Sequence, residues 1–594
     1  MKRYLGDKMG MLSKLKERCY AFVHADVHPE FFPIDAWTDA RYADWFERHR
    51  AKGVDLANQR GSRFSWEPTF SFIVPLYKTP LPYLRDMADS VLGQTYGNLE
   101  LVLINASPED PELKAALQAY AKLDDRVKLV ELEGNRGITE NTNCGLAAAE
   151  GDFVCFLDHD DFIESDTLFE YASALNRDSS IDVLYCDEDM VMEDRGGFRH
   201  LSPLFKPSFS PELLLSKNYI MHLMTIRRSI VNGMPAPDAR YDGSQDYNML
   251  LYATSQARKV YGVQKVLYHW RISDASTATN PDSKPYSRRS ARLAIQNQLK
   301  RGSLDADIIA SGVASLYNLW FGVSGDQKIS VVVRCGCERL AVARFVEWFE
   351  QTNSFDRCEL IMVVPNRGVL PEEFVAQGSY VIASEDQRLF ECFNRGARSA
   401  TGDYLLFMDD SCSFLTPEPL EQLIGMCSLR GIGAVAPKTL YADGMTKCFG
   451  IAITSKRIMP LYRGYPDDFP GYQCNMRAFQ NCSAVGYQGL VTPAKAFFEA
   501  GGFDERFEGD VGTADYCLRL RNLGYRIVQT PTVKVECEEK SPRERYDNSL
   551  NALDFSEADI AYFDEKWPGL RSKGDPYFNK NLDQGSGYFQ VASF

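Results

Sequence analysis

The chain has 594 residues, of which 45% are hydrophobic and 25% are charged, and its formal net charge is −15. This length predicts two to four domains with substantial cores, since a domain commonly holds about 150 residues. The negative charge argues against a nucleic-acid backbone as the main partner, because phosphate contacts need a basic face. It still allows a small phosphorylated ligand whose charge is neutralised by one metal ion.

The first 66 residues are expected to form a helical leader. No apolar run approaches the roughly 20 residues that cross a bilayer, and the start lacks the apolar core and cleavage site of a signal peptide. Its first 18 residues hold six basic and two acidic residues. One helical face there carries Met11, Leu12, Leu15, Cys19, Phe22 and Val23. Such a helix fits an anionic membrane surface or the protein's own body equally well.

The cysteines carry no metal or disulfide signature. There are 15 of them, scattered without regular spacing and without a CxxC pair. This usage indicates reduced thiols in a cytoplasmic protein.

Residues 70–304 alternate β-rich runs with amphipathic stretches. We expect strands at 71–75, 99–104, 127–132, 153–157 and 183–186. We expect helices at 81–92, 111–120, 139–149 and 165–175. This alternation predicts an α/β fold with a mainly parallel, doubly wound sheet, whose ligand crevice lies outside the carboxyl ends of the strands.

The same order of elements begins again after a connector. GDFVCFLDHDD (151–161) matches GDYLLFMDDSC (402–412), and GSQDYNMLL (243–251) matches GTADYCLRL (512–520). Two matches in the same order indicate a duplicated domain. The expected parts are the leader (1–66), a first domain (67–304), the connector (305–327), a second domain (328–552) and a tail (553–594).

Three carboxylates follow the fourth expected strand, where an open α/β sheet has its ligand crevice. They are Asp158, Asp160 and Asp161. Carboxylates this close repel one another, and a divalent cation such as Mg²⁺ or Mn²⁺ relieves the repulsion and can also hold a diphosphate. The alternative from this triplet alone is a solvated acidic turn.

Several motifs in order resemble the inverting family-2 glycosyltransferases, which have a GT-A fold. The resemblance covers about residues 70–302. Its motifs are SFIVPLYKTP (71–80), SVLGQTYGNLELVLI (90–104), GNRGITENTNCGLAAAEGDFVCFLDHDD (134–161), GSQDY (243–247) and YHWR (268–271). YCDED (185–189) and FKPSFSPELLLSKNYIMH (205–222) further resemble the bacterial branch that builds cell-surface polysaccharides.

The resemblance implies a donor site, a metal site and a catalytic base. The donor-binding residues would be Pro75, Tyr77, Asn105, Asn135, Asn141 and Asp158. The metal ligands would be Asp160, Asp158 and His269, holding Mn²⁺ or Mg²⁺. Asp246 would be the base that takes the proton of the acceptor hydroxyl, since such a hydroxyl is a poor nucleophile at neutral pH. Taken alone, Asp246 also suits a helix amino terminus, and His269 a partly buried histidine.

One position departs from the family pattern. Where the family has an acidic residue with Gly-Ser after the second strand, this chain has Asn105, Ala106 and Ser107. Asn105 still donates and accepts hydrogen bonds but has no charge. The usual uridine preference is therefore open, and thymidine or another base fits as well.

The second domain resembles rhamnosyltransferase-like members of the family but changes several site positions. Aligned by sequence, Ser411 replaces Asp160, Glu538 falls opposite His269, and Asp515 remains opposite Asp246. Arg334 and Cys335 fall near Leu76 and Tyr77. We expect a domain that transfers no sugar and instead binds acceptor glycan or braces the first domain. The alternative is a second active site that uses Asp409, Asp410 and Asp515.

Together these features predict a metal-dependent inverting glycosyltransferase in bacterial cell-surface polysaccharide synthesis. It would move a sugar from a nucleotide-sugar donor to a glycan or lipid-linked acceptor, in the cytoplasm or on the inner face of the membrane, with no nucleic-acid partner. The alternatives are a bifunctional transferase and an inactive glycan-binding scaffold. A nucleotidyltransferase would need a glycine-rich loop after the first strand, which residues 76–80 lack.

Overall fold

The computed structural model describes residues 40–194, 197–272, 285–313, 315–377, 379–383, 388–541 and 555–592. The basic amino-terminal helix expected from the sequence lies outside these residues. The described chain divides into two compact units. Unit 1 comprises residues 40–209 and Asn218–Gly302, and unit 2 comprises Ser210–Lys217 and Ser303–Ala592. The connector expected at 305–327 therefore belongs to unit 2.

Unit 1 is built on a nine-stranded sheet of order β3-β2-β1-β4-β8-β6-β9-β5, with β7 paired to β6. Its strands are β1 (Phe70–Leu76), β2 (Leu99–Asn105), β3 (Val127–Glu131), β4 (Phe153–Phe156), β5 (Phe162–Ile163), β6 (Ile181–Asp194), β7 (Gly197–Leu204), β8 (Thr225–Arg227) and β9 (Lys259–Arg271). The first four paired strands, from β3 to β4, are parallel, and so are β6 and β9. Strand β8 runs antiparallel between β4 and β6. The expected α/β fold is confirmed, with one reversed strand inside the sheet.

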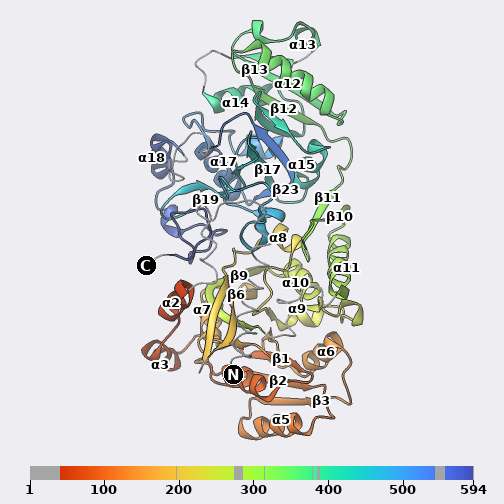
Figure 1. The fold of residues 1–594 in the computed structure, drawn as a ribbon, viewed down its shortest axis with the longest axis vertical. Coiled ribbons are helices and arrows are strands. Elements are labelled where there is room, and N and C mark those ends of the chain that lie inside the picture. The colour runs from red at the N-terminus through yellow and green to blue at the C-terminus, as the bar shows by residue number, and fades with distance from the viewer. Residues whose placement is uncertain are drawn as a thin grey trace, which may run out of the picture. The chain divides into compact units, whose positions relative to one another are not determined.

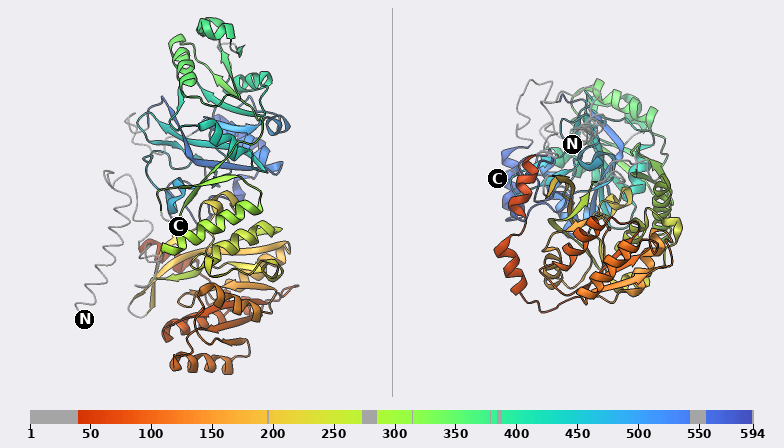
Figure 2. Two further views of the ribbon diagram at one scale, coloured as in Figure 1. Left: turned by 90° about the vertical axis from the view of Figure 1, so that its right-hand side faces the viewer. Right: turned by 60° about the horizontal axis from the view of Figure 1, so that its bottom comes forward.

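The helices of unit 1 connect these strands. They are α2 (Ala40–His49), α3 (Gly53–Gly61), α4 (Leu81–Leu92), α5 (Pro111–Leu123), α6 (Ile138–Ala148), α7 (Thr167–Arg177), α9 (Arg228–Gly233), α10 (Gln245–Gln256) and α11 (Pro285–Arg301). Strands β1, β2 and β3 lie side by side, and α5 runs along the β3 edge (Figures 1 and 2). Strand β2 is buried along its whole length, and only Pro75 of β1 is partly exposed, because helices cover the sheet.

Unit 2 is built on a ten-stranded sheet of order β14-β13-β12-β15-β22-β17-β23-β16. The strands of this path are β12 (Ile329–Arg334), β13 (Cys358–Val364), β14 (Ser379–Ile382), β15 (Tyr404–Asp409), β16 (Cys412–Phe414), β17 (Ile432–Tyr441), β22 (Leu490–Pro493) and β23 (Arg526–Cys537). Off the path, β18 (Thr446–Cys448) pairs with β17 and β21 (Gln480–Asn481) with β23. Strands β14, β13, β12 and β15 are parallel, and β22 runs antiparallel to β15. Unit 1 has the same arrangement, with β8 antiparallel to β4.

Smaller elements complete unit 2. Its helices are α8 (Pro211–Ser216), α12 (Arg339–Thr352), α13 (Glu372–Gln377), α14 (Leu389–Ser399), α15 (Pro419–Cys427), α16 (Ala494–Glu499), α17 (Asp510–Asn522) and α18 (Glu557–Lys566). Two hairpins are formed by β10 (Ala306–Ala310) with β11 (Tyr317–Phe321) and by β19 (Ile451–Ile453) with β20 (Ile458–Pro460). The tail, which has no clear sequence pattern, contributes α18, which packs on α17.

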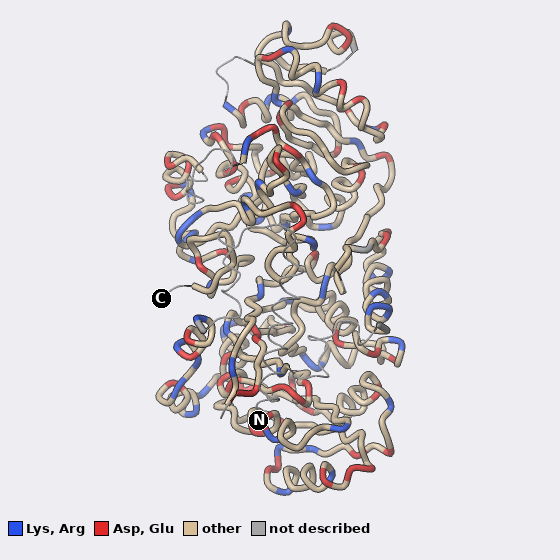
Figure 3. Tube along the Cα trace, viewed as in Figure 1, with Lys and Arg blue, Asp and Glu red and all other residues tan. Residues whose placement is uncertain are grey.

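Charged residues of both signs occur throughout both units. Acidic and basic residues are interspersed along both units, and α11 carries basic residues without an acidic one (Figure 3). Among the described residues, no helix is long and apolar enough to cross a membrane. The fourteen cysteines in the described part of the chain are free thiols.

A repeated hydrogen-bond triplet supports the duplication predicted from sequence. In unit 1, the Gly151 N–H donates to Ser71 Oγ (2.9 Å), and that hydroxyl donates to Glu100 (2.5 Å). A Cβ at Gly151 would lie 2.5 Å from Ser71 Oγ, so only glycine fits. The same bonds in unit 2 join Gly402, Ser330 and Glu359.

Strand register corrects two sequence matches between the units. Phe70 lies opposite Phe153 in unit 1, and Ile329 lies opposite Tyr404 in unit 2. Counting along the strands makes Arg334 the counterpart of Pro75, one residue earlier than the sequence alignment placed it.

The match of Glu538 with His269 is also wrong by register. Phe162 lies opposite His269, and Ser413, which matches Phe162, lies opposite Glu536. Glu536 is therefore the counterpart of His269. Both β9 and β23 contain register shifts against their neighbours, which an ungapped sequence comparison does not detect.

Helix α14 lies close to its sheet through Gly396, the counterpart of Gly145 in α6. A Cβ at Gly396 would lie 2.3 Å from Val332 Cγ1 and 2.9 Å from Val363 Cγ2. Gly396→Ala should therefore lower the free energy of unfolding of unit 2 by about 1–3 kcal/mol. Urea unfolding followed by circular dichroism measures this. The control is Gly322→Ala, where a Cβ meets only Asp305 Oδ2 at 3.7 Å; equal midpoints for both variants would contradict the close packing.

Candidate active site

The candidate site of unit 1 lies at the carboxyl ends of β1, β2 and β4. Pro75 is the last residue but one of β1, Asn105 is the last residue of β2, and Asp158 follows β4. Leu76 pairs with Asn105 in the register of β1 and β2. Because parallel strands end at the same edge, these predicted donor residues share one edge of the sheet.

The three carboxyl groups after β4 lie in different surroundings. The side chain of Asp158 is 62% exposed, whereas Asp161 is fully buried. Asp161 accepts hydrogen bonds from the Tyr268 hydroxyl (2.5 Å) and the Arg271 backbone N–H (2.8 Å). Burial and then the charges of Asp160 and Asp158 raise the pKa of Asp161 well above its usual range. Burial and Asp158 also raise the pKa of Asp160. This mutual repulsion is what a divalent cation relieves.

His222 joins this group, although the sequence did not single it out. Its Nε2 lies 3.9 Å from Asp158 Oδ2, and its Nδ1 lies 3.5 Å from Glu188 Oε2. Its ring stacks on Tyr268 with centroids 4.5 Å apart. Burial lowers the pKa of His222, but Glu188, Asp158 and Asp161 together raise it to about 9.

A buried ion pair supports the backbone that carries His222. Lys206 Nζ donates to Glu188 Oε2 (2.8 Å) and to the backbone carbonyls of Ile220 (2.5 Å) and His222 (2.6 Å). Three acceptors satisfy the three donors of the ammonium group. The pair therefore fixes both the Glu188 carboxylate and the chain at residues 220–222.

Asp246 lies in the first turn of α10, where the helix dipole favours a negative charge. Asn218 Nδ2 donates to Asp246 Oδ2 at 2.8 Å. Burial is the largest influence on the pKa of Asp246 and raises it, while the charge of His222 lowers it and that of Asp158 raises it. The structure thus brings Asp246 within electrostatic reach of Asp158 and His222.

The predicted nucleotide-base region is organised by Asn105. Its Nδ2 donates to Glu131 Oε2 (2.8 Å), and its Oδ1 accepts from the Ser107 N–H (3.0 Å). Ser107 Oγ accepts in turn from the Lys78 N–H (2.8 Å). Tyr77 is 41% exposed beside this loop. Asn105 therefore links the ends of β2 and β3 and leaves the Tyr77 ring accessible.

Asn135, in the turn before α6, accepts a hydrogen bond from Asn141, in the first turn of α6. Asn141 Nδ2 and the Gly137 N–H both donate to Asn135 Oδ1, at 2.9 and 3.0 Å. Gly137 has a φ of 95°, and a Cβ there would lie 2.8 Å from Asp242 Oδ2. Asp242 also accepts from the Thr139 hydroxyl (2.6 Å), which joins this turn to the loop before Asp246.

His269 lies in a separate buried cluster. Its Nδ1 is 2.6 Å from Asp189 Oδ1, and its Nε2 is 3.0 Å from Glu164 Oε1. Asp189 also faces His200 Nδ1 (2.8 Å), and Arg50 pairs with Glu164 (2.7 Å). Carboxylates only accept hydrogen bonds, so both ring nitrogens of His269 carry protons. Burial lowers the pKa of His269, but Asp189 and Glu164 raise it to about 9.

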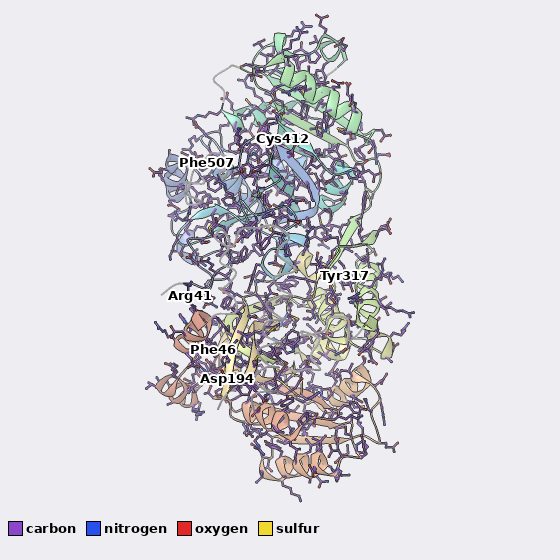
Figure 4. All side chains as sticks on the ribbon, viewed as in Figure 1. Arg41, Phe46, Asp194, Tyr317, Cys412 and Phe507 are labelled. Carbon is purple, nitrogen blue, oxygen red and sulfur yellow. The ribbon has the colours of Figure 1, made fainter. Side chains whose placement is uncertain are left out.

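Helix α2 covers this cluster. Tyr42 donates to Asp189 Oδ2 (2.7 Å), and Phe46, labelled in Figure 4, stacks on His200 with centroids 4.1 Å apart. Phe46 also meets His269 edge-on at 5.3 Å. The cluster thus attaches α2 to the sheet.

Two groups of described side chains could hold a metal ion, and both are in unit 1. The first comprises Asp158, Asp161 and His222, and the second comprises Asp189, His200 and His269. The first is the group beside Asp246 at the sheet edge. Sequence reasoning missed His222 within it, although the motif ending KNYIMH contains that histidine.

Unit 2 has cationic and hydroxyl groups at the corresponding edge. Asp409, the counterpart of Asp158, pairs with Arg334 (2.7 Å) and accepts from the Tyr487 hydroxyl (2.7 Å). Asp410 accepts from the Gly336 N–H at 2.9 Å. The Arg334 guanidinium therefore neutralises Asp409, the carboxylate at the end of β15.

Asp515 does not join Asp409 and Asp410. It pairs with Arg519 (3.0 Å) and Lys566 (2.8 Å) and accepts from Trp567 Nε1 (2.9 Å). These partners hold it against α18. The first-turn carboxylate of α17 is instead Asp510, whose pKa is raised by burial.

Comparison with known proteins finds a family similarity in unit 1. Residues 71–232 match the model of Glycosyl transferase family 2. This match covers β1 to β8 together with Asp158, Asp161, Glu188 and His222. Residues 71–232, which lie in unit 1 apart from Ser210–Lys217, are therefore similar to this glycosyltransferase family.

Two curated relatives extend over most of the chain. The "Uncharacterized protein y4gI" of Sinorhizobium fredii is 28% identical over 87% of the chain and 58% of its own length. The "O-antigen biosynthesis protein RfbC" of Myxococcus xanthus is 26% identical over 91% of the chain and 42% of its own length. The chain thus spans about half the length of these relatives. A crystal structure of S. aureus TarS 1–349 with UDP-GlcNAc is 23% identical over 39% of the chain and 66% of that chain, with a TM-score of 0.32.

The pKa of His269 predicts a pH-dependent stability for unit 1. An unfolded histidine has a pKa near ~6.5, so its raised folded value favours the folded state below that pH. This contribution should disappear as the pH rises from about 6.5 through 9, and it amounts to roughly 2–3 kcal/mol. Urea unfolding between pH 6 and 9.5 measures it.

The matched variants are His269→Gln and His222→Gln, because the pKa of His222 is also raised to about 9. Each should lose part of the slope of stability against pH. A wild-type stability that is flat over this range would contradict the charged state of both rings.

Proposed function

We propose that unit 1 is a metal-dependent inverting glycosyltransferase that uses a nucleotide-sugar donor. The observation that carries this proposal is the grouping of Asp158, Asp161 and His222 beside Asp246 at the carboxyl edge of a family-2 sheet. An acidic cluster next to a held carboxylate supplies the two chemical needs of the reaction. The first need is a place for a divalent cation, whose positive charge would stabilise the departing diphosphate. The second is a base that takes the proton of the acceptor hydroxyl.

The residues present fit a divalent cation. Asp158, Asp161 and His222 offer two oxygen ligands and one nitrogen ligand, and carboxylate oxygens are ligands that suit Mn²⁺ and Mg²⁺. The pKa of Asp161, raised by burial and by the charges of Asp160 and Asp158, indicates that the group favours added positive charge. His222 would give up its proton on binding the ion. A bound ion would stabilise negative charge on the diphosphate. Asp160, next to them, is the ligand that the family pattern implies.

Asp246 is proposed as the base of the transfer. It takes the proton of the acceptor hydroxyl while the acceptor oxygen forms its bond to the anomeric carbon. The bond from that carbon to the diphosphate breaks, and its electron pair leaves with the nucleoside diphosphate. Direct displacement inverts the anomeric centre. Asn218 holds the Asp246 carboxylate through its 2.8 Å hydrogen bond.

The donor base is proposed to lie against Tyr77 and Pro75. Both polar groups of Asn105 are engaged within the protein, so Asn105 shapes this region through the Ser107 loop. Glu131, its partner, supplies the nearest carboxylate on β3. The donor is proposed to be a uridine or thymidine diphosphate sugar, with Asn135 and Asn141 as further donor-binding residues.

The acceptor is proposed to be a glycan or lipid-linked saccharide of the bacterial surface. One relative is named for O-antigen biosynthesis and another, TuaG of Bacillus subtilis, for teichuronic acid biosynthesis. The reaction is proposed to take place in the cytoplasm or on the inner face of the membrane. Unit 2 is proposed not to transfer sugar, because Arg334 neutralises Asp409 and Asp515 is engaged with α18.

The test of the base is Asp246→Asn. This variant should lower kcat for sugar transfer about 10²- to 10⁴-fold because no carboxylate remains to take the proton. It should bind the donor normally. Release of nucleoside diphosphate from a panel of UDP-, dTDP- and GDP-sugars with Mn²⁺ or Mg²⁺ measures turnover. The matched control is Asp515→Asn; loss of one linkage in that variant would favour two active domains.

In wild type, the rate should fall as the pH drops through the raised pKa of Asp246, which lies above the ordinary value of about 3.9 for an aspartate. A protonated carboxyl cannot accept the acceptor proton. A pH–rate profile without this acid limb would contradict the role. A wild-type chain that binds no sugar nucleotide and releases no diphosphate would favour a glycan-binding scaffold.

The metal group is tested by His222→Gln and Asp161→Asn. Each should weaken Mn²⁺ binding about 10- to 100-fold, because one ligand of three is lost. Isothermal titration with Mn²⁺ measures this without turnover. The same titration on Asp160→Asn and His269→Gln tests the two ligands that the family resemblance implies but that lie outside the group of Asp158, Asp161 and His222. If His269→Gln alone abolishes binding, the ion sits in the second cluster.

A further inference from the structure

Two cysteine side chains face each other inside unit 2, although nothing in the spacing of the cysteines pointed to the pair. Cys412, which Figure 4 labels, and Cys537 are 125 positions apart in the chain, and their Sγ atoms lie 3.3 Å apart. Cys412 is 3% exposed and Cys537 is 1% exposed. One thiol can therefore donate a hydrogen bond to the sulfur of the other. This contact joins two distant parts of the chain without a covalent bond.

The two cysteines are direct neighbours on an antiparallel ladder. They pair in the register of β16 and β23, and in the next pair the Glu538 N–H donates to the Ser411 carbonyl (3.0 Å). Hydrogen-bonded and non-hydrogen-bonded pairs alternate along such a ladder, so Cys412 and Cys537 form a non-hydrogen-bonded pair, whose Cα atoms lie about 4.5 Å apart. Disulfides join residues whose Cα atoms are about 4.4–6.8 Å apart. The spacing of the backbone here therefore already suits a disulfide.

Strand β16 can open without unfolding the sheet. It has three residues and ends the path of its sheet, with β23 as its neighbour on that path. Local opening needs the least free energy where an element is short and has few partners. A small oxidant can therefore reach the two buried sulfurs while the other strands stay paired.

Lys447 brings positive charge to the two thiols. Its Nζ is 2.6 Å from Glu539 Oε1. Burial lowers the pKa of Lys447, but the charges of Cys537 and Glu539 raise it above its usual value. The hydrogen bond with Cys537 and then burial raise the pKa of the Cys412 thiol well above its usual value, and Lys447 opposes this rise. Cys412 therefore keeps its proton, and Cys537 is the sulfur that reacts as a thiolate, the nucleophilic form of cysteine.

The first cysteine of the pair takes the place of a carboxylate of unit 1. In the matching stretches 151–161 and 402–412, Cys412 stands where unit 1 has Asp161. The strands that begin there, β5 and β16, both pair antiparallel with the last long strand of their sheet. Asp161 belongs to the first group of side chains that could hold a metal ion. Carboxylates suit hard divalent cations, whereas thiols suit soft metals and redox chemistry, so the two units differ in chemistry at this position.

We propose that Cys412 and Cys537 are a redox modification site, which hydrogen peroxide converts into a disulfide and which a thiol reductant restores. The proposal does not depend on the sugar-transfer reaction of unit 1. The disulfide ties β16 covalently to β23, and β16 directly follows Asp410 and Ser411. Oxidation thereby fixes the turn after β15 at the carboxyl edge of unit 2.

The oxidation proceeds in two steps. In the first, the Cys537 thiolate attacks one oxygen of the peroxide, the O–O bond breaks, and the hydroxide that leaves takes up the proton that Cys537 had released. Cys537 is then a sulfenic acid. In the second, the Cys412 sulfur attacks the Cys537 sulfur, the S–O bond breaks, and the departing hydroxide takes the Cys412 proton. Two thiols and one peroxide give one disulfide and two waters, and the two electrons that the sulfurs lose pass to the peroxide oxygens.

The test exposes the folded wild-type chain to hydrogen peroxide and then alkylates the remaining thiols with N-ethylmaleimide in urea. Peptide mass spectrometry should find most of the chain with a linked pair of peptides that contain Cys412 and Cys537, and the pair should weigh two hydrogens less than the separate peptides. Dithiothreitol should restore both thiols. The exposed thiol of Cys337 reports the dose of peroxide. If Cys412 and Cys537 are both still alkylated at a dose that oxidises Cys337 completely, the proposal is wrong.

Single variants identify the partners. Cys412→Ser and Cys537→Ser should each form no link that dithiothreitol reverses, because one sulfur of the pair is missing. The matched control is Cys427→Ser, since Cys427 is another buried thiol of unit 2, with its Sγ 3.7 Å from the Val491 carbonyl oxygen. It should form the link to the same extent as wild type. A disulfide from Cys412 or Cys537 to any other cysteine in the wild-type chain would overturn the proposal.

Thermal unfolding shows whether the bond fits the folded strands. A disulfide that closes a long loop lowers the entropy of the unfolded chain, so the linked wild type should have a Tm for unit 2 about 5–15 °C above that of the reduced form. Calorimetry measures the shift, and dithiothreitol should reverse it. Cys412→Ser should show no such shift after the same treatment. An unchanged or lower Tm in a fully linked sample would show that the bond distorts the β16–β23 pair and would overturn the proposal.

Discussion

The site of unit 1 depends on one buried ion pair, Lys206 with Glu188. Burying two charges is costly unless every donor and acceptor finds a partner, and here the ammonium also binds the carbonyls of Ile220 and His222. The pair thereby fixes a stretch of chain that has no regular secondary structure. The imidazole of His222 then meets Asp158 on one side and Glu188 on the other. Without this pair, Asp158 and Asp161 would keep their places after β4, but His222 would no longer be held beside them.

The two units show how one frame carries different chemistry. Both keep the Ser–Glu–Gly triplet and the close helix glycine, because these features hold the sheet itself. They differ at the carboxyl edge, where charge is concentrated. In unit 1, the charge of Asp158 raises the pKa of both Asp160 and Asp161, whereas unit 2 places Arg334 on the matching carboxylate, Asp409. Packing residues are constrained by their neighbours on every side, whereas edge residues face a crevice and change more freely.

Sequence patterns predicted β1 to β4 and α4 to α7 closely, because buried strands are continuous apolar runs and their helices are amphipathic. They gave only part of β6, and β5, β7, β8 and β9 were not predicted. They also placed Asp158 and Asp246 on the correct elements. The patterns were weaker between the units: Arg334 and Glu538 were aligned one and two residues from their structural positions, because loops and register shifts leave no trace in composition. His222 was missed because a lone histidine after a polar loop has no periodic signal.

The sequence by itself determined the α/β class, the duplication and the acidic group after the fourth strand, since each follows from local patterns along the chain. Only the tertiary structure decided which histidine stands beside that group. His269 and His222 lie 47 positions apart, and their roles follow from what surrounds each ring. Two carboxylates enclose His269 in a buried cluster, while the Lys206 pair turns His222 toward Asp158. Likewise, only the fold revealed that residues 210–217 belong to unit 2, because this depends on contacts between residues as distant as Glu212 and Arg526.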